Sequence, residues 1–408
     1  MATQKVQIGF DVAVTGGDFL TLDDPIKGKL DDATYPLGGI ILVDVTERVR
    51  EFTISRGKSR ELDRYDAGEA TIEFNNLDRA FDPTYEDSPY AGQILPKREV
   101  QISSDDIIQF RGFIDDWNLE YTTDGQALSI AVASDDFTAL NNRTLTAQTA
   151  TPQTSGQRVN AILDDPDVNF PADNRDIDTG YAQLGADEIA DDTNVLDYLR
   201  TIEQTEPGRL FMSKSNELVF KDRLVAPRSE GIVELADDGT GIKYGQMRVV
   251  FGTEQLHNEV VVSSVITGNT AVALDPDSIT EYGLLNLTLT DLLMDTDEQA
   301  SDLAIFLASK YSQPEYRFES VDIQFSNLTP AQQLQILSLE LGDVCKVTFT
   351  PGNVPPAIVR YAEIIGIEHQ VDSVDQIVTL NFSTLDFTYL VLDDPAFGKL
   401  DSGNALAF

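Results

Sequence analysis

Apolar and polar residues alternate along much of this chain with the period of two that is typical of half-buried β-strands. In the first third, alternation predicts strands over residues 40–43, 52–55, 70–75, 98–103, 107–113, 117–121 and 128–133. Polar turns separate them, including acid pairs at 105–106 and 115–116. Short strands at this spacing indicate a barrel or sandwich. We therefore expect a first β-barrel domain over residues 46–150.

The pattern changes between residues 151 and 230. A stretch rich in Thr, Gln, Ser and Pro over residues 147–156 predicts a linker. Ser155 is placed to cap a short helix that Pro166 closes, and a second helix is expected from about Asn194 to Pro207. A hairpin follows over residues 210–220. These elements predict a small mixed α/β module over 151–230.

Alternation returns in the last third of the chain. It predicts strands over residues 247–251, 259–264, 284–289, 320–325, 345–349, 358–363, 364–371 and 376–382. One helix is expected to begin at Thr296, which forms a capping-box pattern with Gln299, and to stop before Pro314. Residues 231–388 are thus predicted to form a second β-barrel domain. The fold class is mainly β with an α+β insert.

A decapeptide near the start of the chain recurs near its end. Residues 22–31 and 392–401 are identical at eight of ten positions, and these copies define the predicted terminal segments 1–45 and 389–408. Asp-Asp-Pro with a nearby Gly is turn chemistry. The alternative is a cation site at Asp23, Asp24, Asp393 and Asp394, although each copy offers few of the six or more oxygen ligands that calcium takes. We expect Asp24 and Asp394 to occupy similar environments.

Charge is the most unusual feature of the composition. The 408 residues include 69 acids and 29 bases, which gives a net charge of −40. Sequence-specific binding of a nucleic-acid backbone is therefore not expected, because it depends on clustered Lys and Arg. A surface adapted to high salt, or a wall past which nucleic acid slides without sticking, would each favour such acidity. No apolar run approaches 18 residues and no signal-peptide pattern opens the chain, so we expect synthesis in a reducing cytoplasm and no membrane-spanning segment.

Candidate catalytic residues are few. His257 and His369 are the only histidines, and Cys345, the only cysteine, lies in an apolar run that predicts a buried core position. Carboxylate pairs at 115–116, 135–136, 191–192 and 237–238 are too numerous to mark a glycosidase site. The loop at 237–241 resembles half of a calcium loop but lacks the bidentate acid. We expect no enzymatic activity, no cofactor and no metal.

Two stretches are candidates for contacts with other subunits. Residues 46–64 hold six basic side chains interleaved with acids, and the loop at 81–97 has no periodicity. Long loops inside compact domains are usually functional. The interface candidates are Arg48, Arg50, Arg56, Lys58, Arg60, Arg64, Phe81, Tyr85 and Tyr90.

The order of these stretches resembles minor tail proteins of long-tailed bacteriophages. The resemblance rests on residues 48–68, on 76–83 with 88–90, on 98–102 with 110–117, and on the C-terminal segment 392–408. It implies a baseplate hub at the tail tip, in which a trimer offers six barrels to a hexameric tail tube. It also implies an acidic conduit through which DNA passes without specific binding.

The implied partners are further copies of this chain, the tail tube and distal tail proteins, and the tip, fibre and tape-measure proteins. The implied location is the tail tip of the virion, after synthesis in the host bacterial cytoplasm. Three alternatives stay open from the sequence. They are a hexameric distal tail ring, which would carry one barrel per chain, a carbohydrate-binding host-recognition protein with exposed aromatic loops (Tyr85, Tyr90 and Tyr121 are candidates), and a cell-wall glycosidase.

Overall fold

A computed structural model describes residues 2–11, 40–223 and 232–385 of the chain. Both decapeptides, and with them Asp23, Asp24, Asp393 and Asp394, lie outside the described residues. The comparison of the surroundings of Asp24 and Asp394 therefore stays a prediction.

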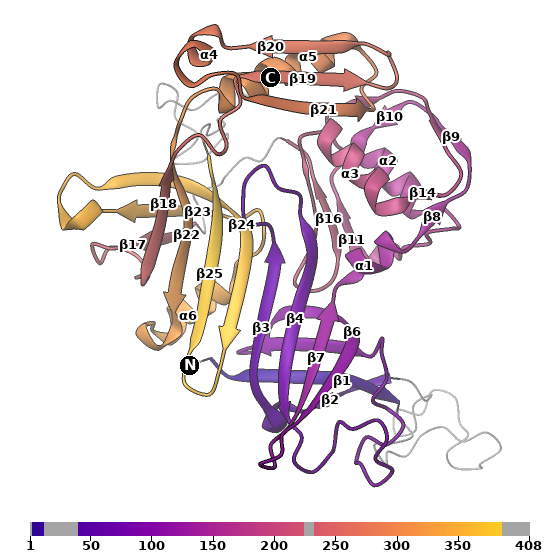
Figure 1. The fold of residues 1–408 in the computed structure, drawn as a ribbon, viewed down its shortest axis with the longest axis vertical. Helices are drawn as coiled ribbons and strands as arrows, with labels where there is room; N and C mark the ends of the chain where they lie inside the picture. Colours follow the sequence, from indigo (N-terminus) through magenta and orange to yellow (C-terminus); the bar gives the residue numbers. More distant parts are fainter. Residues whose placement is uncertain (1, 12–39, 224–231, 386–408) are drawn as a thin grey trace.

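A single sheet of thirteen strands organises the molecule (Figure 1). Eleven strands follow one another in the order β18-β22-β25-β24-β3-β4-β7-β6-β5-β1-β2, and β23 joins β24 and carries β17. The strands of the first half are β1 (Gln4–Asp11), β2 (Ile40–Asp44), β3 (Val49–Gly57), β4 (Asp66–Asn75), β5 (Glu99–Ser104), β6 (Ile107–Tyr121) and β7 (Ala127–Ser134). Those of the second half are β17 (Val233–Ala236), β18 (Gln246–Phe251), β22 (Tyr316–Gln324), β23 (Val344–Phe349), β24 (Ile358–Val371) and β25 (Gln376–Thr384).

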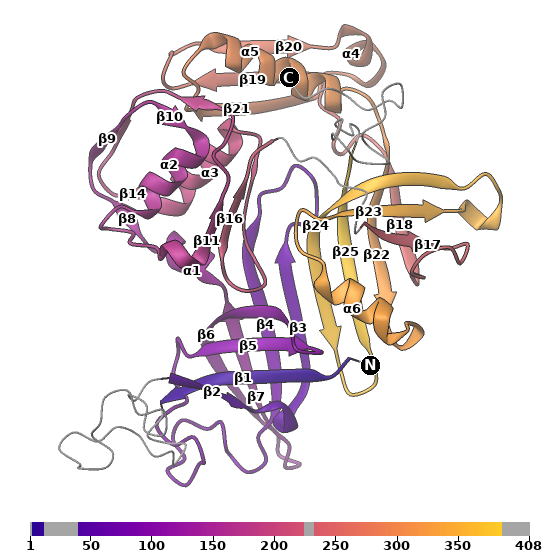
Figure 2. The ribbon, with the colours of Figure 1, turned by 180° about the vertical axis from the view of Figure 1, so that it is seen from behind.

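The first half folds back on itself, so that β1, β2 and β5 run across β3 and β4 (Figure 2). The long strand β6 makes this possible, since its first part pairs with β5 and its second part pairs with β7. A bulge after Ile114 leaves Asp115 without an opposite residue in the register with β7 and lets the strand bend. The sequence prediction of two strands broken at 115–116 is therefore wrong. Phe52, Phe74 and Phe110 are buried in the core of this half.

The second half has an equivalent long strand, β24, whose first part pairs with β23 and whose second part pairs with β25. Its bulge falls after Ile364, so the two strands expected at 358–363 and 364–371 are one. Cys345 is fully buried on β23, as its apolar surroundings predict. The short helix α6 (Pro330–Ser338), which the sequence analysis did not anticipate, begins with a capping box of Thr329 and Gln332.

The two halves are joined by backbone pairing between β3 and β24, from Phe52 opposite Val371 to Gly57 opposite Gly366. The prediction of a mainly β protein is confirmed. Two separate closed barrels are not confirmed, because the thirteen strands of the two halves share one open sheet.

A helical module follows the first half. It contains α1 (Asp136–Asn141), α2 (Ser155–Leu163) and α3 (Val195–Thr205) with the hairpin β15 (Arg209–Met212) and β16 (Leu218–Lys221), which confirms both expected helices and the hairpin. The expected linker instead holds β9 (Gln148–Ala150) and β10 (Gln153–Thr154), and Thr154 rather than Ser155 caps α2. The other short strands are β8 (Thr144–Leu145), β11 (Arg175–Ile177), β12 (Gln183–Leu184), β13 (Asp187–Ile189) and β14 (Thr193–Asn194).

A separate three-stranded sheet in the order β20-β19-β21 lies at one end of the molecule (Figure 1). Its strands β19 (Glu259–Ser264), β20 (Thr270–Leu274) and β21 (Asn286–Leu292) accompany α4 (Pro276–Tyr282) and α5 (Asp297–Tyr311). Thr296 caps α5 by accepting from the Gln299 N–H at 3.4 Å, but the Gln299 side chain does not return the bond, so the expected capping box is only half formed. The 3-10 helices are η2 (Thr46–Arg48), η3 (Ala172–Asn174), η4 (Phe325–Asn327) and η5 (Pro351–Asn353).

Substitution of Gly57 tests how closely the two halves approach. Gly57 has φ of +93°, and a Cβ there would collide with the carbonyl oxygen of Ile365 and lie 2.8 Å from Gly366 Cα. Gly125, with φ of +91°, has nothing within 4 Å of the same position. We expect Gly125→Ala to cost about 1 kcal/mol of unfolding free energy from backbone strain alone, and Gly57→Ala to cost several kcal/mol. Chemical denaturation measures both, and equal losses would contradict close packing at the junction.

Candidate functional site: buried ionic contacts and open strand edges

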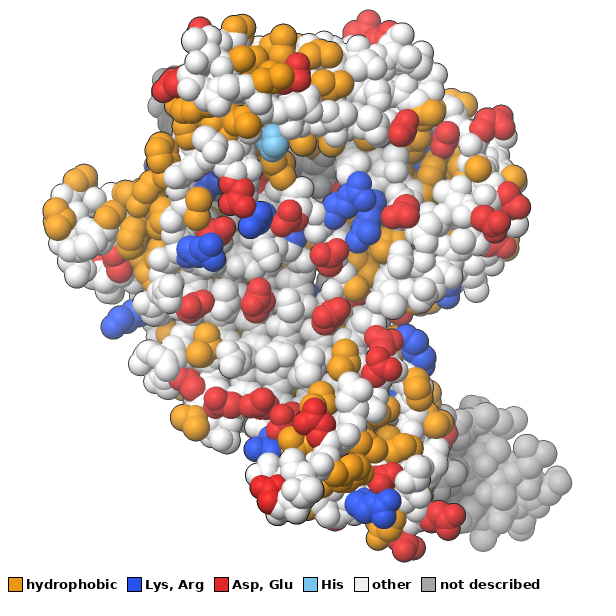
Figure 3. Space-filling model, in the orientation of Figure 1, with side chains coloured by type: hydrophobic (Ala, Val, Ile, Leu, Met, Phe, Trp, Pro, Cys, Tyr) orange, Lys and Arg blue, Asp and Glu red, His pale blue; other side chains and the backbone are white. Residues whose placement is uncertain are grey.

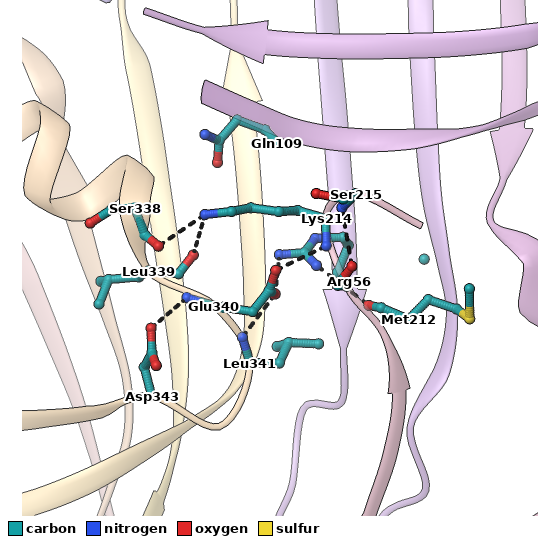
Figure 4. A network of polar contacts seen from close by, with 12 residues as sticks. Arg56, Gln109, Met212, Lys214, Ser215, Ser338, Leu339, Glu340, Leu341 and Asp343 are labelled. Atoms are coloured by element: carbon teal, nitrogen blue, oxygen red, sulfur yellow. Dashed lines mark hydrogen bonds and ion pairs between the residues drawn. The ribbon is translucent and has the colours of Figure 1, made fainter. Parts of the chain in front are cut away.

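Arg56 forms the central polar contact of the junction (Figure 4). It lies on β3, and its side chain is 3% exposed. One guanidinium nitrogen donates to Glu340 Oε1 at 2.8 Å, and another lies 3.5 Å from the carbonyl oxygen of Met212. Glu340 follows α6 and Met212 ends β15, so one side chain binds three distant segments.

Glu340 is held by further donors. The backbone N–H of Lys214 donates to its Oε2 at 2.9 Å, and its own neighbour Leu341 donates to Oε1 at 2.9 Å. Burial by itself would raise the pKa of Glu340, but Arg56 and these N–H groups hold the pKa below its usual value. The carboxylate therefore stays ionised where the segments meet.

Lys214 secures the end of α6. Its Nζ donates to the carbonyl oxygens of Leu337, Ser338 and Leu339 at 3.0, 2.9 and 3.1 Å, which are the groups that a helix leaves unpaired at its C-terminus. Gln109 of β6 donates to the same Leu337 carbonyl at 3.1 Å. The first half, the hairpin and α6 are thus bound at one point.

His369 lies beside this network on β24, opposite Ile54 of β3. Burial first, and then the nearby charges of Arg56 and Lys214, lower its pKa to about 3. The imidazole is neutral at ordinary pH and 3% exposed. The expectation that His369 is a strand residue is confirmed.

A second group of charges is buried where β3 leaves the junction. Lys58 Nζ donates to the Glu61 carbonyl at 2.7 Å and lies 4.7 Å from the Tyr65 ring centroid, and burial lowers its pKa. Arg209 donates to Glu363 at 2.6 Å. Glu203 accepts from the Leu210 N–H at 3.0 Å, and burial raises its pKa to about 7.

The structure separates the nine interface candidates into two sets. Arg56 and Phe81 are buried among residues of this chain, and Lys58 is bound within it. Arg48 pairs with Asp78 at 2.7 Å, Arg50 with Glu73 at 3.1 Å and Arg60 with Glu254 at 2.6 Å, while Arg64 borders a cavity of about 820 Å³ between the β3–β4 connection and α3. A subunit role for these residues stays a prediction.

The loop at 81–97 is organised by stacked aromatic rings. Phe81 stacks on Trp117 at 5.7 Å and on Tyr90 at 5.4 Å between ring centroids, and Tyr90 also stacks on Phe10 at 4.8 Å. Tyr85 packs against the Arg79 guanidinium at 4.7 Å. The Thr84 hydroxyl, with Arg79 and Tyr121, holds the pKa of the buried Asp82 well below its usual value. The loop is ordered by its own contacts.

Other polar groups that the sequence analysis singled out have structural contacts. Asp135 caps α1 by accepting from the Phe137 N–H at 3.0 Å, and Asp237 accepts from the Thr350 N–H at 2.5 Å. Burial raises the pKa of the Cys345 thiol to about 12 and lowers that of His257. Among residues 2–11, 40–223 and 232–385, no cluster of three His, Cys, Asp or Glu is arranged to hold a metal ion.

Sequence reasoning missed Glu340, Lys214 and Gln109, because they come from separate segments and no local pattern marks them. It also missed α6, for which the Thr329–Gln332 capping box was an available signal.

Comparisons with known proteins support the resemblance seen in the sequence. No family model matches the chain, and no curated protein matches it in sequence. The 43 kDa tail protein of prophage MuSo2 from Shewanella oneidensis superposes with a TM-score of 0.58 at 12% identity, over 94% of this chain and 97% of that one. A tail protein from Neisseria meningitidis MC58 gives 0.57 at 12% identity, over 86% and 94%. This chain therefore has the fold of phage tail proteins. No helix in the described part of the chain is long and apolar enough to cross a membrane.

Replacing Arg56 tests the junction network. Arg56→Met removes a buried cation and leaves the Glu340 carboxylate without its ion-pair partner, so we expect a loss of about 3–5 kcal/mol of unfolding free energy. Arg50→Met, which removes an exposed pair on the same strand, should cost at most about 1 kcal/mol. Fluorescence of Trp117, the only tryptophan, reports unfolding in denaturant. Equal losses in the two variants would contradict the role assigned to Arg56.

Glu203 should make stability depend on pH. The unfolded chain loses this proton near the usual glutamate pKa, whereas the folded chain keeps it until about pH 7. The contribution of Glu203 to stability is therefore present at low pH and falls as the pH rises from about 4.5 to 7. The unfolding free energy of Glu203→Gln should rise relative to that of the wild type as the pH increases across this window, by at most about 3 kcal/mol. Exposed Glu217→Gln is the control, and parallel pH profiles for Glu203→Gln and wild type would refute the assignment.

Proposed function

We propose that this chain is a structural component of a bacteriophage tail, and specifically the tip hub that joins the tail tube to the baseplate. The observation that carries the proposal is the agreement of the fold with a tail protein over nearly the whole of both chains. At 12% identity this agreement concerns the fold, so the hub role is inferred from how the fold is built.

The arrangement of the sheet supports a hub over a distal tail ring. The antiparallel strands β3-β4-β7-β6 and β18-β22-β25-β24 form two units in the same order within one chain. Three copies would present six such units to a hexameric tube, whereas a ring protein with one unit per chain would need six copies. Two units in one chain therefore favour a trimer.

The net charge of −40 supports a conduit for DNA. Acidic side chains are spread over the face in Figure 3, and basic ones gather mainly across its middle. A wall of this sign repels phosphates and lets a genome pass without binding. The proposed partners are the tube, distal tail, tip, fibre and tape-measure proteins of the virion.

Isolated tails and the purified chain test the proposal. We expect cryo-electron microscopy to place three copies at the tail tip, with acidic side chains on the inner wall, and native mass spectrometry to find a species of three times 44.9 kDa. Six copies in a ring would favour the distal tail alternative. A location outside the tail, or a neutral or basic inner wall, would refute the hub or the conduit respectively.

A further inference from the structure

The two four-stranded units correspond residue by residue at their long strands. In β6 the bulge follows Ile114, whose N–H donates to the Arg98 carbonyl at 2.8 Å. In β24 the bulge follows Ile364, whose N–H donates to the Asp343 carbonyl at 2.8 Å. The carbonyl of each isoleucine also accepts from the N–H of the residue just before that acceptor, which is Lys97 in the first unit and Gly342 in the second. Ile114 therefore corresponds to Ile364.

Counting from these isoleucines aligns the rest of each unit. Residues 116–121 of β6 correspond to 366–371 of β24. The strands paired with them have the same register, since Asp116 lies opposite Val132 and Gly366 lies opposite Asn381. On the next strands Val132 faces Thr71 and Asn381 faces Ser320. Thr53 of β3 then corresponds to Arg248 of β18, because they face Thr71 and Ser320.

The strand edge that pairs with β3 in the second unit has no described pairing strand in the first unit. Residues 366–371 of β24 pair with β3. Over the equivalent residues 116–121, β6 pairs with β7 on one side, and no described strand lies on the other. Similarly, β18 pairs with β22 alone among the described strands. Among the described strands, the first unit thus has an unpaired edge along residues 116–121 of β6, and the second unit has an unpaired edge along β18.

We propose that β18 of one copy adds to residues 116–121 of β6 in a second copy, in the antiparallel register that β3 and β24 show within the chain. This inference rests on the proposed hub and specifies its subunit contact. The register places Met247 opposite Tyr121, Arg248 opposite Glu120 and Val249 opposite Leu119. Continued along the strand, it places Phe251 opposite Trp117.

The side chains at these positions are complementary. Arg248 and Glu120 carry opposite charges, and cross-strand pairs of this kind stabilise sheets, as do aromatic and aliphatic pairs. Met247, Val249, Leu119 and Trp117 are half-buried, while Phe251 and Tyr121 are 67% and 54% exposed. Exposed apolar side chains along an unpaired strand invite pairing with another chain.

The occupant is a second copy because both edges belong to the same chain and repeat its internal contact. Gly57 ends β3 beside Gly366, and Gly252 follows β18 at the matching position. The contact joins different surfaces of two identical chains, so repetition generates a ring wherever the rotation closes. In a hub of three copies it would leave neither edge open.

Charge reversal tests the register. Glu120→Arg and Arg248→Glu should each weaken association of the purified chain by roughly tenfold or more, because like charges would face each other across the strands. The double variant should recover most of the loss. Asp124→Arg, in the turn after β6, is the matched control and should associate as the wild type does. Since Arg248 also binds Glu319 at 2.5 Å, circular dichroism must show that each variant folds.

Cysteine pairing gives an independent measurement in both purified chain and isolated tails. With Leu119→Cys and Val249→Cys in one chain, mild oxidation should yield disulfide-linked dimers and trimers. Leu119→Cys with Val272→Cys, an exposed position on β20, should yield neither. The native Cys345 is fully buried and should not interfere.

The outcomes separate this inference from the hub proposal. If the chain with Leu119→Cys and Val249→Cys forms trimers but no disulfide, or if both charge-reversal variants associate as the wild type does, the strand pairing is overturned and the hub proposal stands. Tails that hold three copies at the tip with the cross-link formed support both. A chain absent from the tail tip, with no cross-link in either preparation, would overturn both.

Discussion

The backbone ladder between β3 and β24 is the interaction on which the rest of the structure depends. It joins strands separated by about three hundred residues of chain and turns two sheets into one. Because both strands are central, their register fixes how the two halves of the large sheet lie relative to each other. Gly57 at the end of the ladder permits the close approach, and the Arg56–Glu340 contact sits beside it. The same register decides which side of the basic stretch is interior, so Arg56 is buried while Arg50 is exposed.

Few charged side chains are buried in the described part of the molecule, so its core accounts for little of the net charge of −40. Two buried cations have an acid beside them, since Arg56 pairs with Glu340 and Arg209 with Glu363. The fully buried Arg158 donates instead to the Tyr198 hydroxyl and to two backbone carbonyl oxygens. Two buried acids, Asp135 and Glu203, have pKa values raised to about 7, so each is partly protonated at neutral pH. Desolvating unpaired charges would cost more than folding supplies. The interior of the described residues therefore contributes little repulsion.

Local pattern predicted most strands, since alternation depends only on which face of a strand is buried, as in residues 70–75 and 128–133. It failed where geometry depends on distant partners. The Asp115–Asp116 pair has the composition of a turn, yet the bulge at Asp115 continues the strand because β5 and β7 hold it on either side. The open sheet could not be foreseen, because nothing in residues 52–57 marks 366–371 as their partner. For the same reason the Arg56, Lys214 and Glu340 network was invisible, and Arg56 was grouped with exposed bases.

Association of several copies of such an acidic chain is opposed by long-range repulsion, and this limits the kind of contact that a hub can use. Repulsion between surfaces falls off within about 8 Å at physiological ionic strength. Backbone hydrogen bonds and apolar contacts act at shorter range and lose little to the net charge. An added strand supplies both, and Arg248 brings a cation to an edge where Glu120 faces outward. A contact made of strand pairing thus suits the proposed hub, whose acidic surface would repel both DNA and other copies.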